Sequence, residues 1–430
     1  MADTLLRTVQ ARALPLREAR DLEPLLDRIG DAKVVMLGEA THGTSEFYTW
    51  RARITERLVA EKGFSFVAVE GDWPDCRRLD RYVKGEGEAA SAREVLHAFD
   101  RWPTWMWANR EVAALAEWLR TWNATREPGR RVGFYGLDVY SLWDSLHAIA
   151  GFLASRDGAA LERLAAALRC FEPYGEDVQA YARATRFVDE SCEDEVVALL
   201  RSLQEERQRL GDGAAFFDAE QNALVAKNAE AYYRTMVRGG DASWNLRDAH
   251  MAETLERLLR HHGPGARAIV WAHNTHVGDA RYTDMARAGL WNIGQLAREA
   301  YGEEEVVLVG FGTHRGTVIA AEAWEEPMMR MPVPPAQPES WEEVLHRATP
   351  DDCLLLFRHD EDEELLEVRK HRAIGVVYRP GLEAFGNYVP TVLPRRYDAF
   401  LFLDQTHALH PLHLVERPEV EPPETWPSGF

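Results

Sequence analysis

Acidic and histidine side chains recur directly after apolar runs in this sequence. Glu39 and His42 lie three residues apart, just beyond the apolar run 34–37. A histidine with its reference pKa of about 6.5 can take a proton from water at neutral pH, and a carboxylate beside it can hold the ring in one tautomer. The pair therefore predicts a general base. A histidine that only caps the next helix or satisfies a loop is the competing interpretation.

Two more runs end in residues of the same chemical type. Glu70 closes the run FVAVE, where it could serve a site or be a buried acid bonded to loop amides. His273 and His276 follow the run AIVW, and their spacing could bind a metal, place two donors around an oxyanion, or belong to two ordinary satisfied histidines. Asp72 and Asp75 are expected to be turn and helix-cap residues.

Weaker candidates follow other runs. Asp138 ends YGLD and is expected to contact substrate, whereas His314 and Arg315 in GFGTHRG are expected to lie in a hairpin turn. A last group has metal-like spacing near the end of the chain, where a solvated turn is the expected structure: His407, His410 and His413.

Aromatic residues could line an apolar substrate groove. Trp73 follows the second run, and Trp105 lies in the tryptophan-rich stretch DRWPTWMWANR. We expect both to contact substrate, with core packing or helix-helix contact as the alternative.

The elements that must position these residues alternate between strands and helices. Helical spacing is expected over 45–62, ending at Gly63. Near-continuous apolar strands separated by helices indicate a mainly parallel sheet flanked by helices, and in such sheets ligands bind beyond the carboxyl ends of the strands. The runs that predict buried strands are KVVML, FSFVAVE, RVGFYGLD, ARAIVW and EVVLVG, with AIGVVYRP and YDAFLFLDQ as further candidates.

The pattern changes in the middle of the chain. Residues 1–140 are expected to form the first part of the α/β core, and 141–262 a large helical insertion or cap. Residues 263–430 are expected to complete the core with a C-terminal extension, in which the proline-rich stretch 325–343 is predicted to be an irregular loop.

Composition limits the classes of function. The 430 residues carry 50 basic and 70 acidic side chains, a formal charge of −20, which argues against nucleic acid or an anionic membrane as the main partner. The start has no apolar signal segment, no run is long enough to cross a membrane, and a cytoplasmic location is expected. The four scattered cysteines are expected to be buried free thiols: Cys76, Cys170, Cys192 and Cys353.

Several common motifs are missing. The sequence contains no GxSxG, GxxxxGK[ST], HExxH or strand-linked GxGxxG motif. The usual indications of a serine α/β-hydrolase, a P-loop enzyme, a zincin or a dinucleotide enzyme are therefore lacking. If the protein is a hydrolase, water is the expected direct nucleophile, with no cofactor or bound metal.

Five stretches, taken together and in this order, resemble the erythromycin esterase family: LGEATHGTSEFYTWR, VAVEGDWPD, GLDVYSLWDS, NLRDAHMAETL and VWAHNTHVGD. The resemblance spans about Leu37 to His413 and implies an α/β core with helical additions. It also implies hydrolysis of a macrolide lactone or a similar large lactone.

The same resemblance assigns roles to single residues. His42 matches the general base and Glu39 the acid beside it. Further matches are an active-site arginine, the acid of the second motif and the paired histidines of the fourth strand, which fall on Arg51, Glu70, His273 and His276.

Two other functions remain open at this point. The family is similar to a wider group with haem-binding and metal-dependent members. A metal-dependent hydrolase would use Glu39, His42, Glu70, His273 and His276 as ligands. A protein without enzymatic activity would hold haem or a hydrophobic small molecule between the core and the helical insertion.

Overall fold

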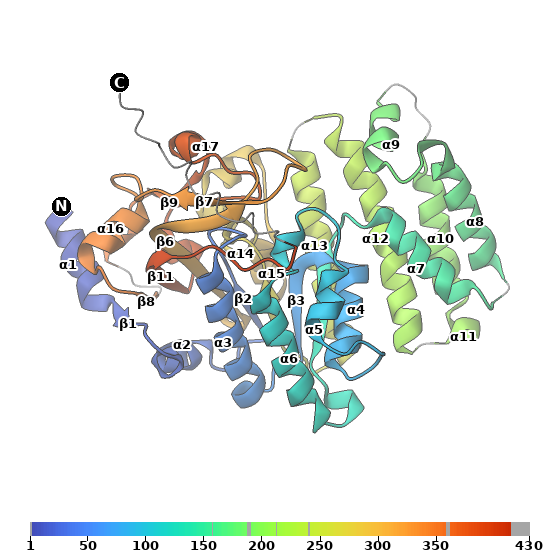
Figure 1. The fold of residues 1–430 in the computed structure, drawn as a ribbon, viewed down its shortest axis with the longest axis horizontal. Coiled ribbons are helices and arrows are strands. Elements are labelled where there is room, and N and C mark those ends of the chain that lie inside the picture. Colours follow the sequence, from blue (N-terminus) through green and yellow to red (C-terminus); the bar gives the residue numbers. More distant parts are fainter. Residues whose placement is uncertain are drawn as a thin grey trace, which may run out of the picture.

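A nine-stranded sheet forms the centre of the molecule (Figure 1). The computed structural model describes residues 2–156, 158–186, 191–211, 213–239, 241–357 and 362–413. The strand order is β1-β8-β11-β6-β2-β5-β3-β4, with β7 paired to β6. The six strands from β11 to β4 in this order run parallel, which confirms the predicted mainly parallel α/β sheet. Their bounds are β2 Val34–Leu37, β3 Phe66–Asp72, β4 Gly133–Asp138, β5 Ala268–Trp271, β6 Val306–Ala320 and β11 Ala399–Thr406.

Helices cover both faces of this sheet because alternate strand residues point to opposite sides. In β2, Val35 and Leu37 join one apolar core, and Val34 and Met36 join the other. The first core is shared with α2 Glu23–Ile29, α3 Ser45–Lys62, α4 Trp73–Val83, α5 Ala92–His97 and α6 Arg110–Ala124. The second is shared with α1 Ala2–Arg12, α13 Ala242–His262, α15 Ile293–Tyr301 and α16 Trp341–Ala348.

All five of the main predicted strands are present, and the helix predicted over 45–62 is α3. It ends at Gly63, whose φ of +68° is the left-handed conformation that favours glycine at a helix end.

Two predictions about strands in the second half of the chain are wrong. The segment 373–380 makes only isolated bridges, at Ile374 and Val377, and the strand lies just before it as β9 Arg369–Arg372, paired with β10 Tyr388–Thr391. The proline-rich stretch contains β7 Met329–Val333, which pairs antiparallel with the far half of β6. Proline has no N–H to donate, but Pro332 lies in an edge strand where no further partner is needed.

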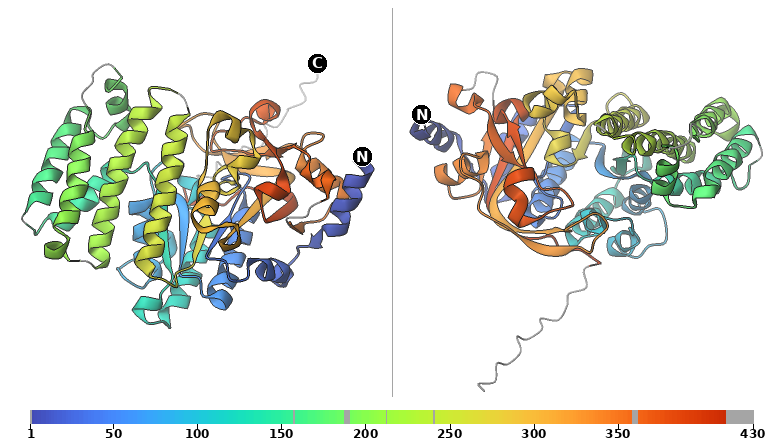
Figure 2. Two further views of the ribbon diagram at one scale, coloured as in Figure 1. Left: turned by 180° about the vertical axis from the view of Figure 1, so that it is seen from behind. Right: turned by 90° about the horizontal axis from the view of Figure 1, so that it is seen from above.

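In the stretch 142–262 the described residues form helices joined by turns and short loops, without a strand, and the stretch extends from the β4 edge of the sheet (Figures 1 and 2). The helices from α7 to α12 enclose an apolar core of their own, which contains Leu146, Leu164, Leu199 and Tyr233. Helix α13 differs because Met251, Leu255 and Leu258 pack into the core of the sheet. The helices are α7 Leu142–Leu153, α8 Ala159–Phe171, α9 Val178–Ala184, α10 Glu193–Glu205, α11 Arg207–Leu210, α12 Ala214–Met236 and α13.

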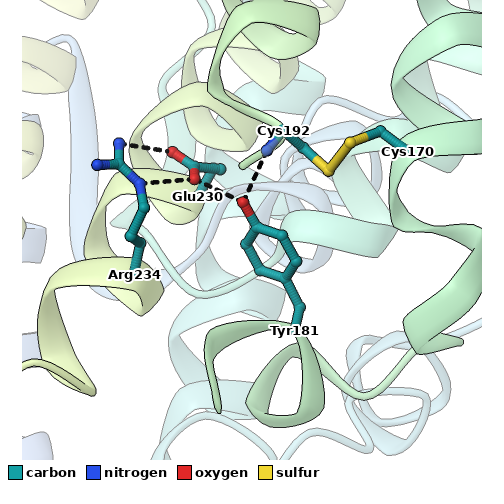
Figure 3. Close-up of a disulfide and its surroundings, with 5 residues drawn as sticks. All are labelled: Cys170, Tyr181, Cys192, Glu230 and Arg234. Atoms are coloured by element: carbon teal, nitrogen blue, oxygen red, sulfur yellow. Dashed lines mark hydrogen bonds and ion pairs between the residues drawn. A yellow bond between two sulfur atoms is a disulfide. The ribbon is translucent and has the colours of Figure 1, made fainter. Parts of the chain in front are cut away.

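Two of the four cysteines are joined, so the prediction of four free thiols is wrong. Cys170 in α8 forms a disulfide with Cys192, directly before α10, whereas Cys76 and Cys353 are free and buried. The packing of α8 against α10 brings together residues that are 22 apart in sequence. Figure 3 shows Tyr181 beside this disulfide, where its hydroxyl donates to Glu230 and accepts from the Cys192 N–H.

Among the described residues, no helix is both long and apolar enough to span a bilayer.

Candidate functional site

The predicted site residues gather at the carboxyl ends of four neighbouring strands, β2, β5, β3 and β4. Glu39 and His42 follow β2, Glu70 and Asp72 lie at the end of β3, and Asp138 ends β4. His273 and His276 follow β5. Parallel strands present their carboxyl ends at one edge, so segments far apart in sequence deliver these side chains to one place.

Backbone contacts hold the turn between β2 and α3. The Glu39 carbonyl accepts from the Asn274 N–H at 2.8 Å, and the Gly43 carbonyl accepts from the Ile319 N–H at 3.0 Å. A Cβ on Gly43 would lie 1.9 Å from the Ile319 carbonyl oxygen, so only glycine allows this approach. The turn that carries His42 is therefore fixed against β5 and β6.

His42 and Glu39 form a buried pair. Nδ1 of His42 lies 2.9 Å from Oε1 of Glu39. Since a carboxylate only accepts, Nδ1 carries the hydrogen and Nε2 keeps a free lone pair. Nε2 has no hydrogen-bond partner among the described residues, and His42 lines a cleft. This ring can accept a proton from the cleft side.

Arg51 lies behind the pair and not in the cleft. Its Nη2 donates to Oε2 of Glu39 at 2.6 Å, and its guanidinium lies over the rings of Tyr48 and Trp271. The side chain is fully buried and does not line the cleft, so the active-site arginine that the resemblance implies has no contact with a substrate there. Arg51 instead holds Glu39 in position and balances its charge.

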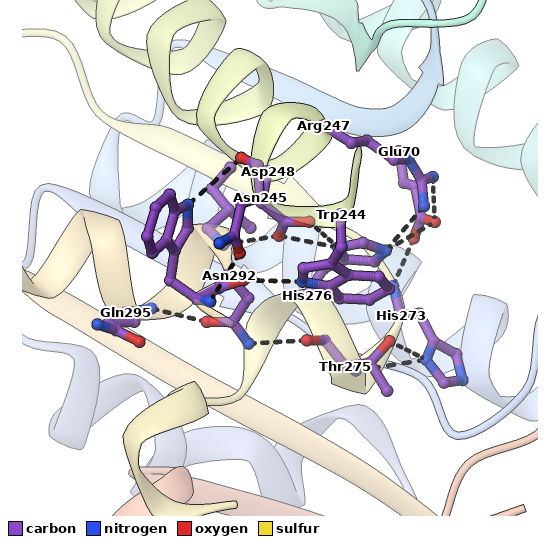
Figure 4. A network of polar contacts seen from close by, with 12 residues as sticks. Glu70, Trp244, Asn245, Arg247, Asp248, His273, Thr275, His276, Asn292 and Gln295 are labelled. Carbon is purple, nitrogen blue, oxygen red and sulfur yellow. Dashed lines mark hydrogen bonds and ion pairs between the residues drawn. The ribbon is translucent and has the colours of Figure 1, made fainter. Parts of the chain in front are cut away.

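Glu70 joins three parts of the site (Figure 4). Oε1 accepts from Nη2 of Arg247 at 2.7 Å and lies 3.4 Å from Nε2 of His276, while Oε2 accepts from the His273 backbone N–H at 2.8 Å. Burial alone would raise the pKa of Glu70, but His276, Arg247 and His42 outweigh it and hold that pKa well below its ordinary value. Glu70 is therefore an anion with little capacity to act as a base.

His276 is enclosed by acids and by an aromatic ring. Its Nδ1 lies 2.9 Å from Oδ1 of Asp248, and Trp244 stacks on its ring with centroids 4.5 Å apart. Burial lowers the pKa of His276, but Asp248 and Glu70 raise it to about 9. Nη1 of Arg247 approaches Nε2 at 3.0 Å, and because arginine only donates, this contact favours the neutral ring. The two carboxylates dominate, so His276 does not act as the base at neutral pH.

His273 packs against the proposed base. Its ring centroid lies 4.9 Å from that of His42, and its Nδ1 accepts from the Thr275 N–H at 3.3 Å. Burial, reinforced by the neighbouring His42, lowers the pKa of His273 well below its ordinary value. The ring is neutral and buried, and it is not among the residues that line the cleft. Its placement is that of a packing and positioning residue.

The cleft has a volume of about 150 Å³. Its lining includes the aromatic and apolar side chains of Phe99, Trp102, Met106, Trp107 and Trp324. It also includes polar and charged side chains, among them His42, Glu70, Asp72, Asp138, Tyr140 and Arg247. The predicted contact residue Asp138 is therefore in the cleft, where both of its oxygens accept from Arg247.

Asp72 stands at the N-cap position of α4, which agrees with its prediction as a turn or cap residue. It precedes α4 but makes no capping hydrogen bond to that helix, and its side chain lines the cleft. Asp75 also lines the cleft and pairs with Arg78. Asp72 ends β3 and Asp75 lies in the first turn of α4, so the junction between these two elements brings both acids to the cleft.

The two predicted aromatic contacts lie in the core. Trp73 is 1% exposed, stacks on Tyr135 and donates to Asp218, and Trp105 is also 1% exposed. Neither lines the cleft, whereas Trp102 and Trp107 from the same stretch as Trp105 do. The spacing of these tryptophans in the sequence did not show which of them face the cleft and which face the core.

His314 and Arg315 do not lie in a hairpin turn, because β6 continues through them as one strand to Ala320. His314 stacks on His346 with centroids 3.8 Å apart, away from the cleft. Within the part of the chain that the structure describes, no three His, Cys, Asp or Glu side chains are placed to hold a metal ion. The C-terminal histidines instead pair separately with Glu46, with Glu111 and with a backbone carbonyl: His407, His410 and His413.

The sequence reasoning did not assign Arg247, Asp248 or Tyr140 to the site. Arg247 and Asp248 come from α13, and Tyr140 lies just beyond β4. The stretch NLRDAH carried a signal, since adjacent arginine and aspartate with no helical charge partner can mark a site on a helix face. That signal was too weak to separate from ordinary surface charge.

Comparisons with known proteins agree with this architecture. The erythromycin esterase family pattern matches residues 59–406. The chain is 22% identical to erythromycin esterase type II of Escherichia coli over 70% of this chain and 73% of that protein. It is 18% identical to the putative hydrolase YbfO of Bacillus subtilis over 90% of this chain and 86% of that protein.

Solved structures share the fold. A protein from Bacillus cereus superposes with a TM-score of 0.80 at 22% identity, covering 96% of this chain and 99% of that chain. An erythromycin esterase mutant in its open conformation gives a TM-score of 0.67 at 18% identity, covering 94% and 96%. With the family pattern matched over most of its length, the chain belongs to the erythromycin esterase family.

Proposed function

We propose that this protein hydrolyses a carboxylic ester or lactone with water as the nucleophile and His42 as the general base. The observation that carries the proposal is the free Nε2 of His42 at the cleft, with Nδ1 held by Glu39. Membership of the erythromycin esterase family supports ester hydrolysis as the type of reaction, without specifying the base or the substrate. A positioned general base contributes about 10²–10⁴-fold to such a reaction.

In the proposed reaction, water binds between Nε2 of His42 and the carbonyl carbon of the substrate. His42 takes one proton as the water oxygen attacks, and Glu39 stabilises the imidazolium through Nδ1–H. Arg51 keeps Glu39 oriented during this step. His42 faces the cleft, Glu39 lies behind it and Arg51 lies behind Glu39. This arrangement resembles that of other hydrolases in which an acid orients a histidine base.

Arg247 is the proposed donor for the oxyanion. It lines the cleft, and burial is outweighed by Asp138, Tyr140 and Glu70, which keep its pKa well above the ordinary value. Glu70 and Asp138 fix the guanidinium, so little reorganisation is needed when negative charge develops on the carbonyl oxygen.

The proposed substrate has an apolar acyl part. Phe99, Trp102 and Trp107 offer apolar surface in the same cleft as His42 and Arg247. The 150 Å³ cleft is smaller than the roughly 300–1,000 Å³ of common ligand pockets, so it matches the reacting portion of a substrate. A macrolide or other large lactone would place its ester carbonyl here and leave the rest of its ring at the mouth, where Trp324 is 56% exposed.

The test is mass spectrometry after incubation with a panel of macrolides, smaller lactones and simple alkyl esters. We expect at least one class to gain one water with wild-type protein and none with His42→Ala. Equal turnover by the two proteins would overturn the assignment of His42. Activity that disappears with a chelator and returns with a defined metal would instead favour the metal-dependent alternative.

A further inference from the structure

Asp72 is a second acid in the cleft that the proposed attack of water does not use. It ends β3 two residues after Glu70 and lines the same cleft as His42 and Arg247. Oδ2 pairs with Nε of Arg101 at 2.5 Å. Oδ1 is buried and has no hydrogen-bond partner among the described residues. One oxygen of Asp72 is therefore held, and the other is unsatisfied.

An unsatisfied buried oxygen is costly as part of a carboxylate and less costly when it carries a proton. Burial raises the pKa of Asp72 to about 7, against the opposing effect of Arg101. Glu70 shows the opposite behaviour two residues earlier, since several cations hold it ionised. The ionisable groups that act on or respond to Asp72 come from the loop before α6 and from β4, α4, α7 and α12: Arg101, Asp138, Asp75, Cys76, Asp144 and Tyr233.

Ester hydrolysis needs an acid as well as a base when the leaving group is an alkoxide. Collapse of the tetrahedral intermediate breaks the bond from carbon to the alkoxy oxygen, and the electron pair of that bond remains on the oxygen. An alkoxide is a poor leaving group unless it receives a proton as it departs. Two acids whose surroundings favour opposite protonation states commonly divide such roles.

We propose that Asp72 is the general acid of this site, giving its proton to the departing alcohol oxygen while Arg101 holds the carboxyl group in place. This assignment rests on the proposed ester hydrolysis. The proton of the Asp72 carboxyl group passes to the alkoxy oxygen as the carbon–oxygen bond breaks, which yields the free alcohol and the Asp72 carboxylate.

The protons balance over the cycle. His42 has gained one proton from water, Asp72 has lost one to the alcohol, and the second hydrogen of the water leaves on the carboxylic acid product. Transfer of a proton from His42 to Asp72 through solvent restores both groups. No oxidant, metal or further reactant is needed.

The experiment compares two esters of one acid that differ only in the leaving group, 4-nitrophenyl butanoate and butyl butanoate. Nitrophenoxide leaves without help, whereas butoxide needs a proton. For Asp72→Asn we expect kcat/KM to fall by about 10²-fold or more with the butyl ester and to change far less with the nitrophenyl ester. A purely structural role of Asp72 would lower both rates by the same factor.

Asp144→Asn is the matched control. Asp144 pairs with the same Arg101 at 2.5 Å but is about half exposed and does not line the cleft. This variant should show the wild-type ratio between the two esters. A second variant, Arg101→Gln, removes the cation that opposes protonation of Asp72. It should move the alkaline loss of butyl ester hydrolysis to higher pH, even if Asp72→Asn fails to fold.

The outcomes separate the two proposals. If wild-type protein hydrolyses neither these esters nor the lactone panel, the proposed function fails. If wild-type protein is active and Asp72→Asn lowers kcat/KM for both esters by the same factor, or for neither, the assignment of Asp72 as general acid is wrong. The proposed hydrolysis with His42 as general base is then unaffected. If Arg101→Gln does not shift the alkaline loss of butyl ester hydrolysis to higher pH, this result alone contradicts the assignment of Asp72.

Discussion

Among the residues that the structure describes, two buried pairs of a histidine with a glutamate have the same design in different surroundings. In the first, Nδ1 of His42 lies 2.9 Å from Glu39 and Nε2 is free at the cleft. In the second, Nδ1 of His371 lies 2.6 Å from Glu342, while Nε2 lies 3.2 Å from Nδ2 of Asn274 and contacts the Tyr397 hydroxyl at 3.3 Å. His371 is fully buried.

The difference lies in the second nitrogen. A carboxylate on Nδ1 orients the ring in both pairs, but only the pair with an open Nε2 can exchange a proton with a ligand. His371 has its ring enclosed by Tyr397 and Phe400, and burial lowers its pKa. A histidine beside an acid is therefore a structural pair by default, and access to the cleft turns it into a candidate base.

The largest expected effect separates the two pairs by activity. His42→Ala should lower kcat by about 10²–10⁴-fold because the base is lost. Unfolding in urea should change little in comparison, since His42 borders a cavity. The kinetic assay uses any ester found in the substrate panel. Normal turnover by His42→Ala would show that the open nitrogen has no catalytic role.

Arg247→Lys tests the arginine that lines the same cleft as His42. Lysine keeps a charge but cannot donate to Glu70 and to both oxygens of Asp138 in the same fork. We expect kcat to fall by about 10²–10³-fold, the usual cost of a lost oxyanion donor. An increase in KM with unchanged kcat would assign Arg247 to substrate binding alone.

His371→Ala should reverse the pattern seen for His42. The change leaves Glu342 buried without its ring partner, so the free energy of unfolding should fall by about 1–3 kcal/mol or more. Turnover per folded molecule should stay near wild type. Urea unfolding and active-site-normalised kinetics measure the two effects. A specific loss of kcat at unchanged stability would contradict the assignment of His371 as structural.

The smallest effect concerns the pH dependence of stability, to which two buried histidines, His250 and His276, should contribute with opposite sign. Burial lowers the pKa of His250 to about 4, so between pH 6.5 and 4 the unfolded chain takes a proton that the folded chain refuses. Stability should fall with pH by about 1.4 kcal/mol per unit from this group. His276, with its pKa raised to about 9, contributes stability below pH 6.5 that is lost as pH rises through 9.

His250→Gln isolates the first contribution. The slope of unfolding free energy between pH 6 and 4.5 should be shallower in this variant than in wild type, and the two curves should run parallel above pH 7. Identical slopes would show that His250 does not titrate differently in the two states.

Much of the core follows from local patterns in the sequence. Buried parallel strands such as 268–271 are short, apolar and followed by polar residues, and this combination is visible without a structure. Site residues at or just beyond the ends of strands, such as Glu70 and His42, can be predicted in the same way. A parallel sheet brings the carboxyl ends of its strands to one edge, so these residues are expected to lie together.

The rest depends on contacts between distant segments. Arg247 lies 177 residues after Glu70, on a helix whose local pattern only indicates which face is apolar. The disulfide of Cys170 and the core positions of Trp73 and Trp105 depend likewise on packing that spacing alone does not reveal. The N-cap position of Asp72 followed from the sequence, but the placement of its side chain in the cleft did not.

The origin of Arg247 in α13 links the helical stretch 142–262 to the chemistry of the sheet. Glu70 and Asp138 come from β3 and β4, and the guanidinium is the cation that bridges them. A shortened protein without 142–262 would keep every strand but would lose the cation that bridges Glu70 and Asp138, as well as the apolar residues of α13 that cover one face of the sheet. In such a shortened protein the negative charges of Glu70 and Asp138 would lack their shared partner, which would destabilise the cleft. The sheet alone is therefore not a suitable minimal version of this protein.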